Sequence, residues 1–277
     1  MTRFSKEKEQ EIIKLYRAGK TQKEIAIFYN TFNTSIRRVL LRYNEKIRTG
    51  ERALRFCKHN PFKRNDEYSD YFLGMLLTDG CVYQRKGAKY KRINLSLSER
   101  DKYMIEIFQN WVTPKIKIST NYKKEFNAFT CSYTFSNEEA VDWLLRKGNF
   151  YNKSYNCKIY TPINWTILRG IFDGDGGFHS SSRHLDFFIC GKSLVFLQQI
   201  YNFLKKQGFT VYLKERYNGN KIKLYYVEIH KIQEVLQLGE FMYNNAHIFL
   251  KRKYEKWLAF YESRRAYSLN SGNEMAI

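Results

Sequence analysis

The sequence predicts an α+β protein in which two tandem repeats, each ordered helix–strand–strand–helix–strand–strand–helix, follow a small all-α unit. Three observations lead to this prediction. Two apolar helical segments end in the same Asp-Gly pair, at Asp79 and Asp175, 96 residues apart. Segments of alternating polarity follow both, as in strands with one buried and one exposed face. Residues 5–43 instead show the helical spacing of apolar side chains.

Composition favours a folded and strongly basic protein. The 277 residues include 48 Lys and Arg against 27 Asp and Glu, a formal charge of +21, and 43% are hydrophobic, enough for a core. Such positive charge is typical of proteins that bind polyanions, most simply nucleic acids. No apolar run approaches the roughly 20 residues that a membrane span needs. We therefore expect no membrane segment, and the polar N-terminus indicates no secretory signal.

The cysteines indicate a reduced compartment. There are five of them, an odd number, and they lack the CxxC spacing of zinc sites or redox motifs. Neither a disulfide framework nor a zinc site is indicated. We expect an intracellular location, in the cytoplasm or nucleoid, with an organelle as an open alternative.

Residues 1–47 are predicted to form a helix-turn-helix domain. A capping box, Thr21-Gln-Lys-Glu24, opens the second helix, and a turn at 30–33 leads to a third. The third helix should point Ser35, Arg37, Arg38 and Arg42 outward. A capped helix followed by an arginine-rich one is typical of helix-turn-helix DNA-binding units, and the run Gly19–Ala26 resembles the start of resolvase-like ones. The alternative is a helical bundle with a solvated basic face.

Residues 48–68 are predicted to be a basic linker, because helical periodicity fades there. Gly50 and Pro61 interrupt the segment, and its cations are Arg48, Arg52, Arg55, Lys58, Lys63 and Arg64. Such a linker could follow a phosphate backbone or be a solvated tether, and the sequence favours neither.

Each repeat opens with a glycine-containing apolar helix that ends in a carboxylate. The first is Phe72-Leu-Gly-Met-Leu-Leu-Thr-Asp-Gly80 and the second is Leu168-Arg-Gly-Ile-Phe-Asp-Gly-Asp-Gly176. Gly74 and Gly170 occupy the same position and predict that the two helices lie in close contact. Both aspartates stand at helix C-termini, where the macrodipole disfavours an anion. Folding alone gives no reason to place them there twice.

Strands and helices alternate after each motif. In the first repeat, residues 69–160, we expect strands at 93–98, 115–118 and 129–135 and helices at 102–111 and 138–145. In the second, residues 161–265, we expect strands at 184–189, 211–216 and 222–229 and a helix at 193–206. Residues 266–277 are predicted to be a C-terminal tail.

If the two apolar helices pack side by side, Asp79 and Asp175 come together, and adjacent carboxylates repel each other. Divalent cations relieve this repulsion, and Mg²⁺ held by paired carboxylates is a standard way to activate water on phosphodiesters. A buried helix followed by a loop aspartate would explain one copy. It does not explain two copies with the same Gly and Asp positions.

The two motifs resemble the paired signature of LAGLIDADG homing endonucleases, in the single-chain form with two motifs, over about residues 69–262. The resemblance implies the LAGLIDADG fold, in which antiparallel sheets form a saddle over double-stranded DNA. It also implies a Mg²⁺ site at Asp79 and Asp175 beside Gly80 and Gly176, with Mn²⁺ as a substitute. The first copy departs at the sixth motif position, where Leu77 replaces the usual Asp. In the family that position serves helix packing and capping rather than metal binding.

The family also places a basic residue of each repeat near the scissile phosphates. The matching residues are Lys153 and Lys253, which follow their aspartates by 74 and 78 residues. As catalytic residues they would polarise the attacking water or stabilise charge developing on the phosphate. Phosphate-anchoring or solvated lysines are the alternative, and Lys251 or Arg252 could take the place of Lys253.

The polar faces of the strands are predicted to bind DNA, since two-stranded ribbons fit the major groove. The residues expected there are Lys115, Lys117, Thr130, Ser132 and Thr134 in the first repeat, and Tyr212, Lys214, Arg216, Lys221 and Lys223 in the second. The prediction does not distinguish the residues that contact bases from those that contact phosphates.

These patterns predict a Mg²⁺-dependent, site-specific endonuclease that cuts double-stranded DNA as a monomer on a long, asymmetric target. The resemblance implies staggered cuts and a gene carried by a mobile intron or standing free. Two alternatives stay open: a non-catalytic LAGLIDADG and helix-turn-helix transcription regulator, and an intron RNA maturase. Retention of both aspartates favours the nuclease, because a pure DNA binder gains nothing from two repelling carboxylates.

Overall fold

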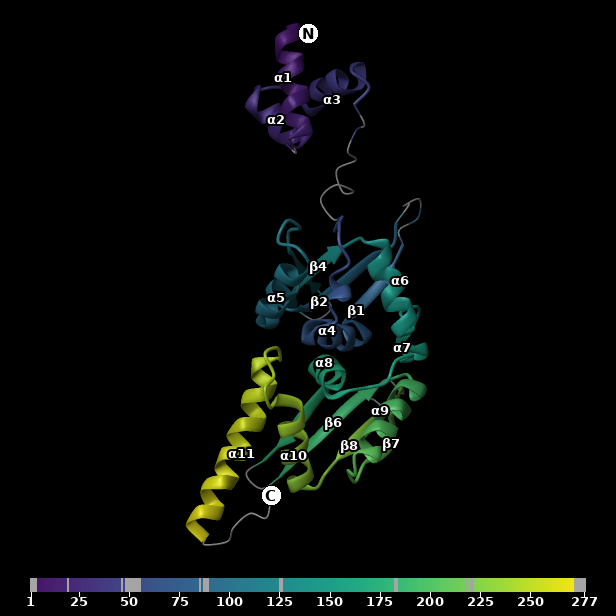
Figure 1. Cartoon of the computed structure of the whole chain (residues 1–277). Helices are drawn as coiled ribbons and strands as arrows, with labels where there is room; N and C mark the ends of the chain where they lie inside the picture. Colours follow the sequence, from purple (N-terminus) through teal and green to yellow (C-terminus); the bar gives the residue numbers. More distant parts are fainter. Residues whose placement is uncertain are drawn as a thin grey trace. The chain divides into compact units, whose positions relative to one another are not determined.

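The computed structural model describes residues 4–18, 20–45, 47, 56–84, 86, 90–124, 127–181, 184–217, 219 and 222–271. The chain divides into two compact units, Met1–Phe56 and Cys57–Ile277 (Figure 1). Each has its own hydrophobic core. The residues singled out above that lie outside the described ones are Gly19, Arg48, Gly50, Arg52, Arg55 and Lys221.

Three short helices make up the N-terminal unit: α1 (Lys6–Arg17), α2 (Gln22–Phe28) and α3 (Asn33–Arg42). The predicted capping box is present, with the Glu24 backbone N donating to Thr21 Oγ1 at 3.2 Å and the Thr21 backbone N donating to Glu24 Oε2 at 2.7 Å. Asn30 ends the turn of α2 in a left-handed conformation, with φ of 46°. Ile12, Ile25, Ile36 and Leu40 are fully buried and hold the three helices together.

The larger unit consists of two copies of one α+β pattern, as predicted. The first copy contains α4 (Glu67–Thr78), β1 (Gly80–Tyr83), β2 (Arg92–Ser98), α5 (Lys102–Val112), β3 (Ser119–Lys123), β4 (Ala128–Phe135) and α6 (Glu138–Lys147). After the short α7 (Lys153–Asn156), the second contains α8 (Trp165–Asp175), β5 (Gly176–Ser180), β6 (Leu185–Gly191), α9 (Leu194–Lys206), β7 (Tyr212–Tyr217), β8 (Lys223–Ile229) and α10 (Ile232–Tyr243), and α11 (Lys251–Ser271) follows. Both sheets are antiparallel, in the orders β1-β2-β4-β3 and β5-β6-β8-β7.

Three predicted boundaries are wrong. The linker predicted at 48–68 reaches too far, because Cys57 and Phe62 are buried in the core of the larger unit, Pro61–Arg64 form a short 3-10 helix and α4 begins at Glu67. Residues 115–118 form no strand: Gln109 at the end of α5 donates its side-chain N–H to the carbonyl of Ile116 at 2.5 Å, and this bond takes up a group that strand pairing would need. The third strand begins instead at Ser119, so Lys115 and Lys117 precede it. At the other end of the chain, α11 continues to Ser271, beyond the predicted start of a tail at 266.

The described part of the chain contains no helix that is both long and apolar enough to cross a membrane.

Helices α4 and α8 lie side by side between the two sheets (Figure 1), in contact through their glycines. A Cβ at Gly74 would lie 2.3 Å from the carbonyl oxygen of Ile167, and one at Gly170 would lie 2.1 Å from that of Tyr71. Because the obstacles are backbone atoms, neither helix can yield without shifting as a whole. The predicted close contact is confirmed, and it brings the two motif helices to the centre of the unit.

We expect Gly170→Ala to lower the free energy of unfolding by about 3 kcal/mol, because the added methyl forces two helix backbones apart. Chemical denaturation followed by circular dichroism measures this. The matched control is Gly219→Ala, since a Cβ at Gly219 meets no atom within 4 Å. Equal stability of the two variants would contradict the close helix contact.

Candidate active site

The two motif aspartates lie together at the ends of α4 and α8. Asp79 is the residue that caps α4, and Asp175 is the last residue of α8. Oδ2 of Asp79 lies 3.0 Å from the position that a Cβ of Gly174 would take, next to Asp175 in the chain. Asp79 is half-buried and Asp175 is exposed, so the pair is open to solvent. The structure therefore places two carboxylates where a ligand can reach them.

The environment of the pair disfavours the charged state. Burial and the charge of Asp175 raise the pKa of Asp79 to about 6. Although Asp175 is exposed, desolvation by the protein around it raises its pKa as well. Two carboxylates held at this cost in free energy are typical of a functional site.

Two lysines, one from each repeat, cap the same two helix ends. Lys153 donates from Nζ to the backbone carbonyls of Leu76, Leu77 and Thr78, while Lys253 donates to those of Phe172, Asp173 and Gly176. Except for that of Gly176, the first residue of β5, these carbonyls belong to the last turn of α4 or α8, and the ammonium groups offset the negative helix ends. The aspartates can sit at helix C-termini because the lysines lie beside them.

Burial lowers the pKa of both lysines, to about 8 for Lys253, while the charges of Asp79 and Asp175 act to raise it. The lysines thus interact with the carboxylate pair through their charge, and their hydrogen bonds to backbone carbonyls fix the helix ends that carry the two aspartates. Sequence reasoning predicted the pair but missed its contacts with the carbonyls, since nothing in the sequence shows which side of a helix end a distant lysine reaches.

Lys253, and not one of its neighbours, is the counterpart of Lys153. Arg252 pairs with Asp101, with 3.1 Å between Nε and Oδ1, and Nζ of Lys251 lies 5.4 Å from the ring centroid of Tyr103. Of these three residues, Lys253 is the one whose side chain donates to carbonyls at the end of α8.

Asp173 shows what the sixth motif position does. Its Oδ2 accepts hydrogen bonds from Tyr71 Oη and from the backbone N of Leu250, both at 2.7 Å. These bonds join α8 to α4 and to the start of α11, which carries Lys253. In the first repeat Leu77 is buried in the core. Both observations agree with a packing and capping position.

The sheets each have one face covered by helices and one open face. In the first sheet Cys131, Tyr133 and Phe135 are buried against the helices, and the strand register places polar residues on the open face. These residues are Arg92, Asn94, Ser96, Ser98, Ser119, Asn121, Lys123, Thr130, Ser132 and Thr134. Thr130 and Ser132 lie there as predicted. Thr134 shares the face but is buried and accepts from Asn94 Nδ2 at 2.8 Å.

The open face of the second sheet carries Tyr212, Lys214 and Arg216, as predicted, next to Tyr226 and Glu228. The prediction for Lys223 is wrong. Lys223 pairs with Tyr217 in the register and therefore lies on the opposite face, where its Nζ contacts Glu215 at 2.8 Å. Side chains alternate with period two within a strand, so Tyr217, three residues after Lys214 on β7, points to the other face, and its partner Lys223 does the same.

In the N-terminal unit, Arg37 and Arg38 are exposed and Ser35 is half-buried on the outer side of α3. Arg42 differs, because its Nη1 pairs with the carboxylate of Glu9, whose side chain is buried. Arg42 thus ties α3 to α1. The N-terminal end of α3 also bears Phe32, whose residue surface is 80% exposed.

The carboxylate pair fits a hard divalent cation. Within the described residues, no group of three or more His, Cys, Asp or Glu side chains could hold a metal ion. Mg²⁺ commonly needs only one or two protein carboxylates, since water and substrate phosphates supply its other ligands. Asp79 and Asp175 would be those two ligands.

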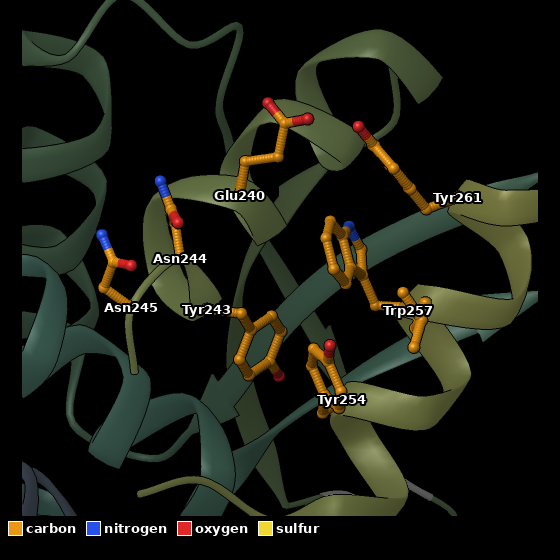
Figure 2. Close-up of a pocket in the computed structure, with 8 residues that line it drawn as sticks. Glu240, Tyr243, Asn244, Asn245, Tyr254, Trp257 and Tyr261 are labelled. Carbon is orange, nitrogen blue, oxygen red and sulfur yellow. The ribbon is translucent and has the colours of Figure 1, made fainter. Parts of the chain in front are cut away.

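A separate pocket of about 440 Å³ lies between α10 and α11 (Figure 2). Its lining residues are Glu240, Tyr243, Asn244, Asn245, Tyr254, Trp257, Leu258 and Tyr261. Figure 2 shows the rings of Tyr243, Tyr254 and Trp257 grouped along one side of it. Neither Asp79 nor Asp175 lines this pocket, which is therefore distinct from the carboxylate site.

Comparisons with known proteins agree with this geometry. The family model of a LAGLIDADG-like domain matches residues 165–240. The homing endonuclease I-WcaI bound to its DNA recognition sequence aligns with a TM-score of 0.50 at 15% identity, over 70% of this chain and 90% of that one. The LAGLIDADG homing endonuclease I-GzeII in complex with its DNA target aligns with a TM-score of 0.48 at 13% identity, over 73% and 91%.

A curated relative is the uncharacterized protein MJ1054 of Methanocaldococcus jannaschii, 24% identical over 183 residues, which cover 61% of this chain. The chain spans about a fifth of that relative's length, since the match covers 20% of it. Together, the family model and the structural match confirm the LAGLIDADG fold that the two motifs predicted.

The raised pKa of Asp79 predicts how stability depends on pH in metal-free protein. Because the folded-state value of about 6 exceeds the ordinary 3.8, stability is lost as the pH rises from about 4 through 6. Asp79→Asn should therefore be more stable than the parent by about 1–2 kcal/mol at pH 7.5 in EDTA, and equal to it below pH 4. Urea unfolding at both pH values measures this. Asp142→Asn, at an exposed position of α6, is the control and should show no such gain.

Proposed function

We propose that this chain is a site-specific endonuclease that hydrolyses both strands of double-stranded DNA with divalent cations held by Asp79 and Asp175. The observation that carries the proposal is the carboxylate pair at the ends of two helices in backbone contact, backed by one lysine from each repeat. Mg²⁺ is the expected ion and Mn²⁺ its substitute. When bound, the ion would lower the pKa of water and stabilise negative charge on the phosphate.

The residues around the carboxylates contribute positioning and charge. Lys153 and Lys253 fix the helix ends through their carbonyls, which keeps Asp79 and Asp175 at a constant separation. Their positive charge also favours the ionised carboxylates, which a divalent cation requires. Because each ammonium group already donates to three carbonyls, the lysines would act on a phosphate through their positive charge rather than through a hydrogen bond, and this charge would stabilise the charge that develops during hydrolysis.

DNA binding is proposed for the open faces of the two sheets. They consist of polar side chains on antiparallel ribbons, and the chain carries a formal charge of +21. I-WcaI, which has the same fold, is bound to its recognition sequence. Because one chain contains both repeats, we propose that it acts as a monomer and that its target is long and asymmetric.

The N-terminal unit is proposed to be a helix-turn-helix domain that contacts DNA with Ser35, Arg37 and Arg38 of α3. Its three-helix order and its cap at Thr21 support this role. Binding by such a tethered unit is effectively intramolecular, so it adds affinity to that of the sheets.

The carboxylate assignment predicts that Asp79→Asn and Asp175→Asn each reduce cleavage at least 100-fold while sequence-specific binding survives, because each variant loses a metal ligand but keeps the open faces. Cleavage is measured on plasmids that contain the flanks of the protein's own gene, and binding by gel shift in EDTA. Asp142→Asn should cut like the parent. Full Mg²⁺-dependent cutting by either active-site variant would refute the assignment, and binding without cutting by the parent would indicate a non-catalytic regulator.

Deletion of residues 1–47 should shorten the DNA footprint at one end and weaken binding, yet leave the cut positions unchanged. The physical reason is that the two units have separate cores, so that the larger one keeps the carboxylates and both sheets. Loss of phosphate contacts should also flatten the dependence of affinity on salt concentration. A truncated protein with the full footprint and affinity would assign the unit to folding or to a protein partner.

A further inference from the structure

Glu228 is a carboxylate in an unexpected place, since it lies on the open face of a sheet proposed to bind a polyanion. It is 3% exposed. Its side chain contacts three cationic or ionisable neighbours: Arg216 Nη2 at 2.7 Å, Lys214 Nζ at 3.0 Å and His230 Nε2 at 3.3 Å. Nδ1 of His230 lies 3.3 Å from Asp186 Oδ1. Glu228 is therefore the centre of an ion-pair cluster that spans β7 and β8.

The cluster holds the two cations in place without burying them. The side chains of Lys214 and Arg216 remain 42% and 47% exposed. The guanidinium of Arg216 also lies 4.7 Å from the ring centroid of Tyr226, which fixes its plane. Only Nη2 bonds to Glu228, which leaves Nε and Nη1 without a hydrogen-bond partner in the part of the chain that the structure describes.

The first sheet has nothing comparable at the corresponding positions. Gly80 pairs with Leu95 in the first sheet, and Gly176 pairs with Ile189 in the second, so these two pairs occupy equivalent positions. The strand pairings that continue from them assign an equivalent residue in the second sheet to each residue on the open face of the first. Thr134 then corresponds to Glu228, Ser119 to Lys214 and Asn121 to Arg216. One open face is thus neutral at these three positions, and the other is built around a charged cluster.

A buried carboxylate restricts what its cations can do. If Lys214 and Arg216 moved away to DNA phosphates, the buried Glu228 would lose both of its permanent cations and keep only His230 of these three partners, which is unfavourable. The two cations therefore stay on the surface of β7 and β8, where they would face the base edges of the major groove that these strands would enter. A fixed arginine with free N–H groups matches the N7 and O6 acceptors of guanine, the commonest specific contact in the major groove.

Resting on the proposed function, we infer that Glu228 is a positioning residue for base recognition, and that it makes Arg216 read a guanine in the half of the target under the second repeat. Lys214 assists as a neighbouring donor to the same stretch of DNA. The half of the target under the first repeat meets only hydroxyl and amide groups at these positions, which accept several bases. Sequence discrimination at these positions is therefore stricter under the second repeat than under the first.

The test is selection of binding sites from a randomised duplex library by the full chain in EDTA, so that no DNA is cut. The variants are Glu228→Gln and Arg216→Gln. The control is Glu215→Gln, which removes the ion pair between Glu215 and Lys223 from the same two strands but on the covered face. Thermal melting of each variant confirms that it is folded.

We expect the parent to prefer guanine at one position under the second repeat. Arg216→Gln and Glu228→Gln should both lose about five- to 150-fold of that preference, at the same base pairs, with the rest of the site unchanged. Glu215→Gln should select the parental site. The inference is overturned if Glu228→Gln keeps the guanine preference, if it relaxes all positions equally, or if Arg216→Gln affects a base other than guanine. A parent that selects no sequence at all would instead overturn the proposed function, and the inference with it.

Discussion

The backbone contact between α4 and α8 is the constraint on which the larger unit depends. With no Cβ at Gly74 or Gly170, the two helices come close enough that their C-terminal ends, and the aspartates there, meet. The same contact lies between the sheets, so it also fixes the relation of one open face to the other. A methyl group at either glycine would clash with backbone and disturb the carboxylate pair together with both sheets.

The close approach of the two aspartates is electrostatically unfavourable, and the lysines beside them offset part of this cost. Two carboxylates and two negative helix ends gather in a small volume, which raises the pKa of Asp79 to about 6. Lys153 and Lys253 reach these ends from α7 and α11, far along the chain from their aspartates, and donate to the exposed carbonyls. Asp173 in turn anchors the start of α11 through Leu250 N. The positions of the lysines are thus part of the fold, and a bound cation would remove the remaining repulsion.

Much of this architecture follows from local sequence, and the departures have physical reasons. The paired Gly and Asp positions predict the helix contact and the carboxylate pair, because both depend on spacing within one helix. The strand predicted at 115–118 is absent because a glutamine of α5 bonds to the Ile116 carbonyl, a tertiary contact without a local signal. Lys223 was placed on the wrong face because its side-chain direction depends on register, which the sequence shows only through alternation. The lysine contacts and the partners of Glu228 join residues distant in sequence, so composition and periodicity could not reveal them.

The two repeats are alike at the helix ends, which hold the carboxylates, and differ on the open strand faces, which are proposed to bind DNA. At the helix ends they match: a glycine, an aspartate and a lysine that caps carbonyls occur in each, as the proposed cutting of two strands of equal chemistry by one centre would require. On the open faces they diverge, since Thr134, Ser119 and Asn121 stand where the other repeat has Glu228, Lys214 and Arg216. Substitutions on an open strand face leave the helix contact untouched, whereas a side chain at either glycine would clash with backbone. A duplicated unit held together by glycines can in this way keep a symmetric carboxylate centre while its two open faces differ, which is what the proposed target with two unequal halves requires.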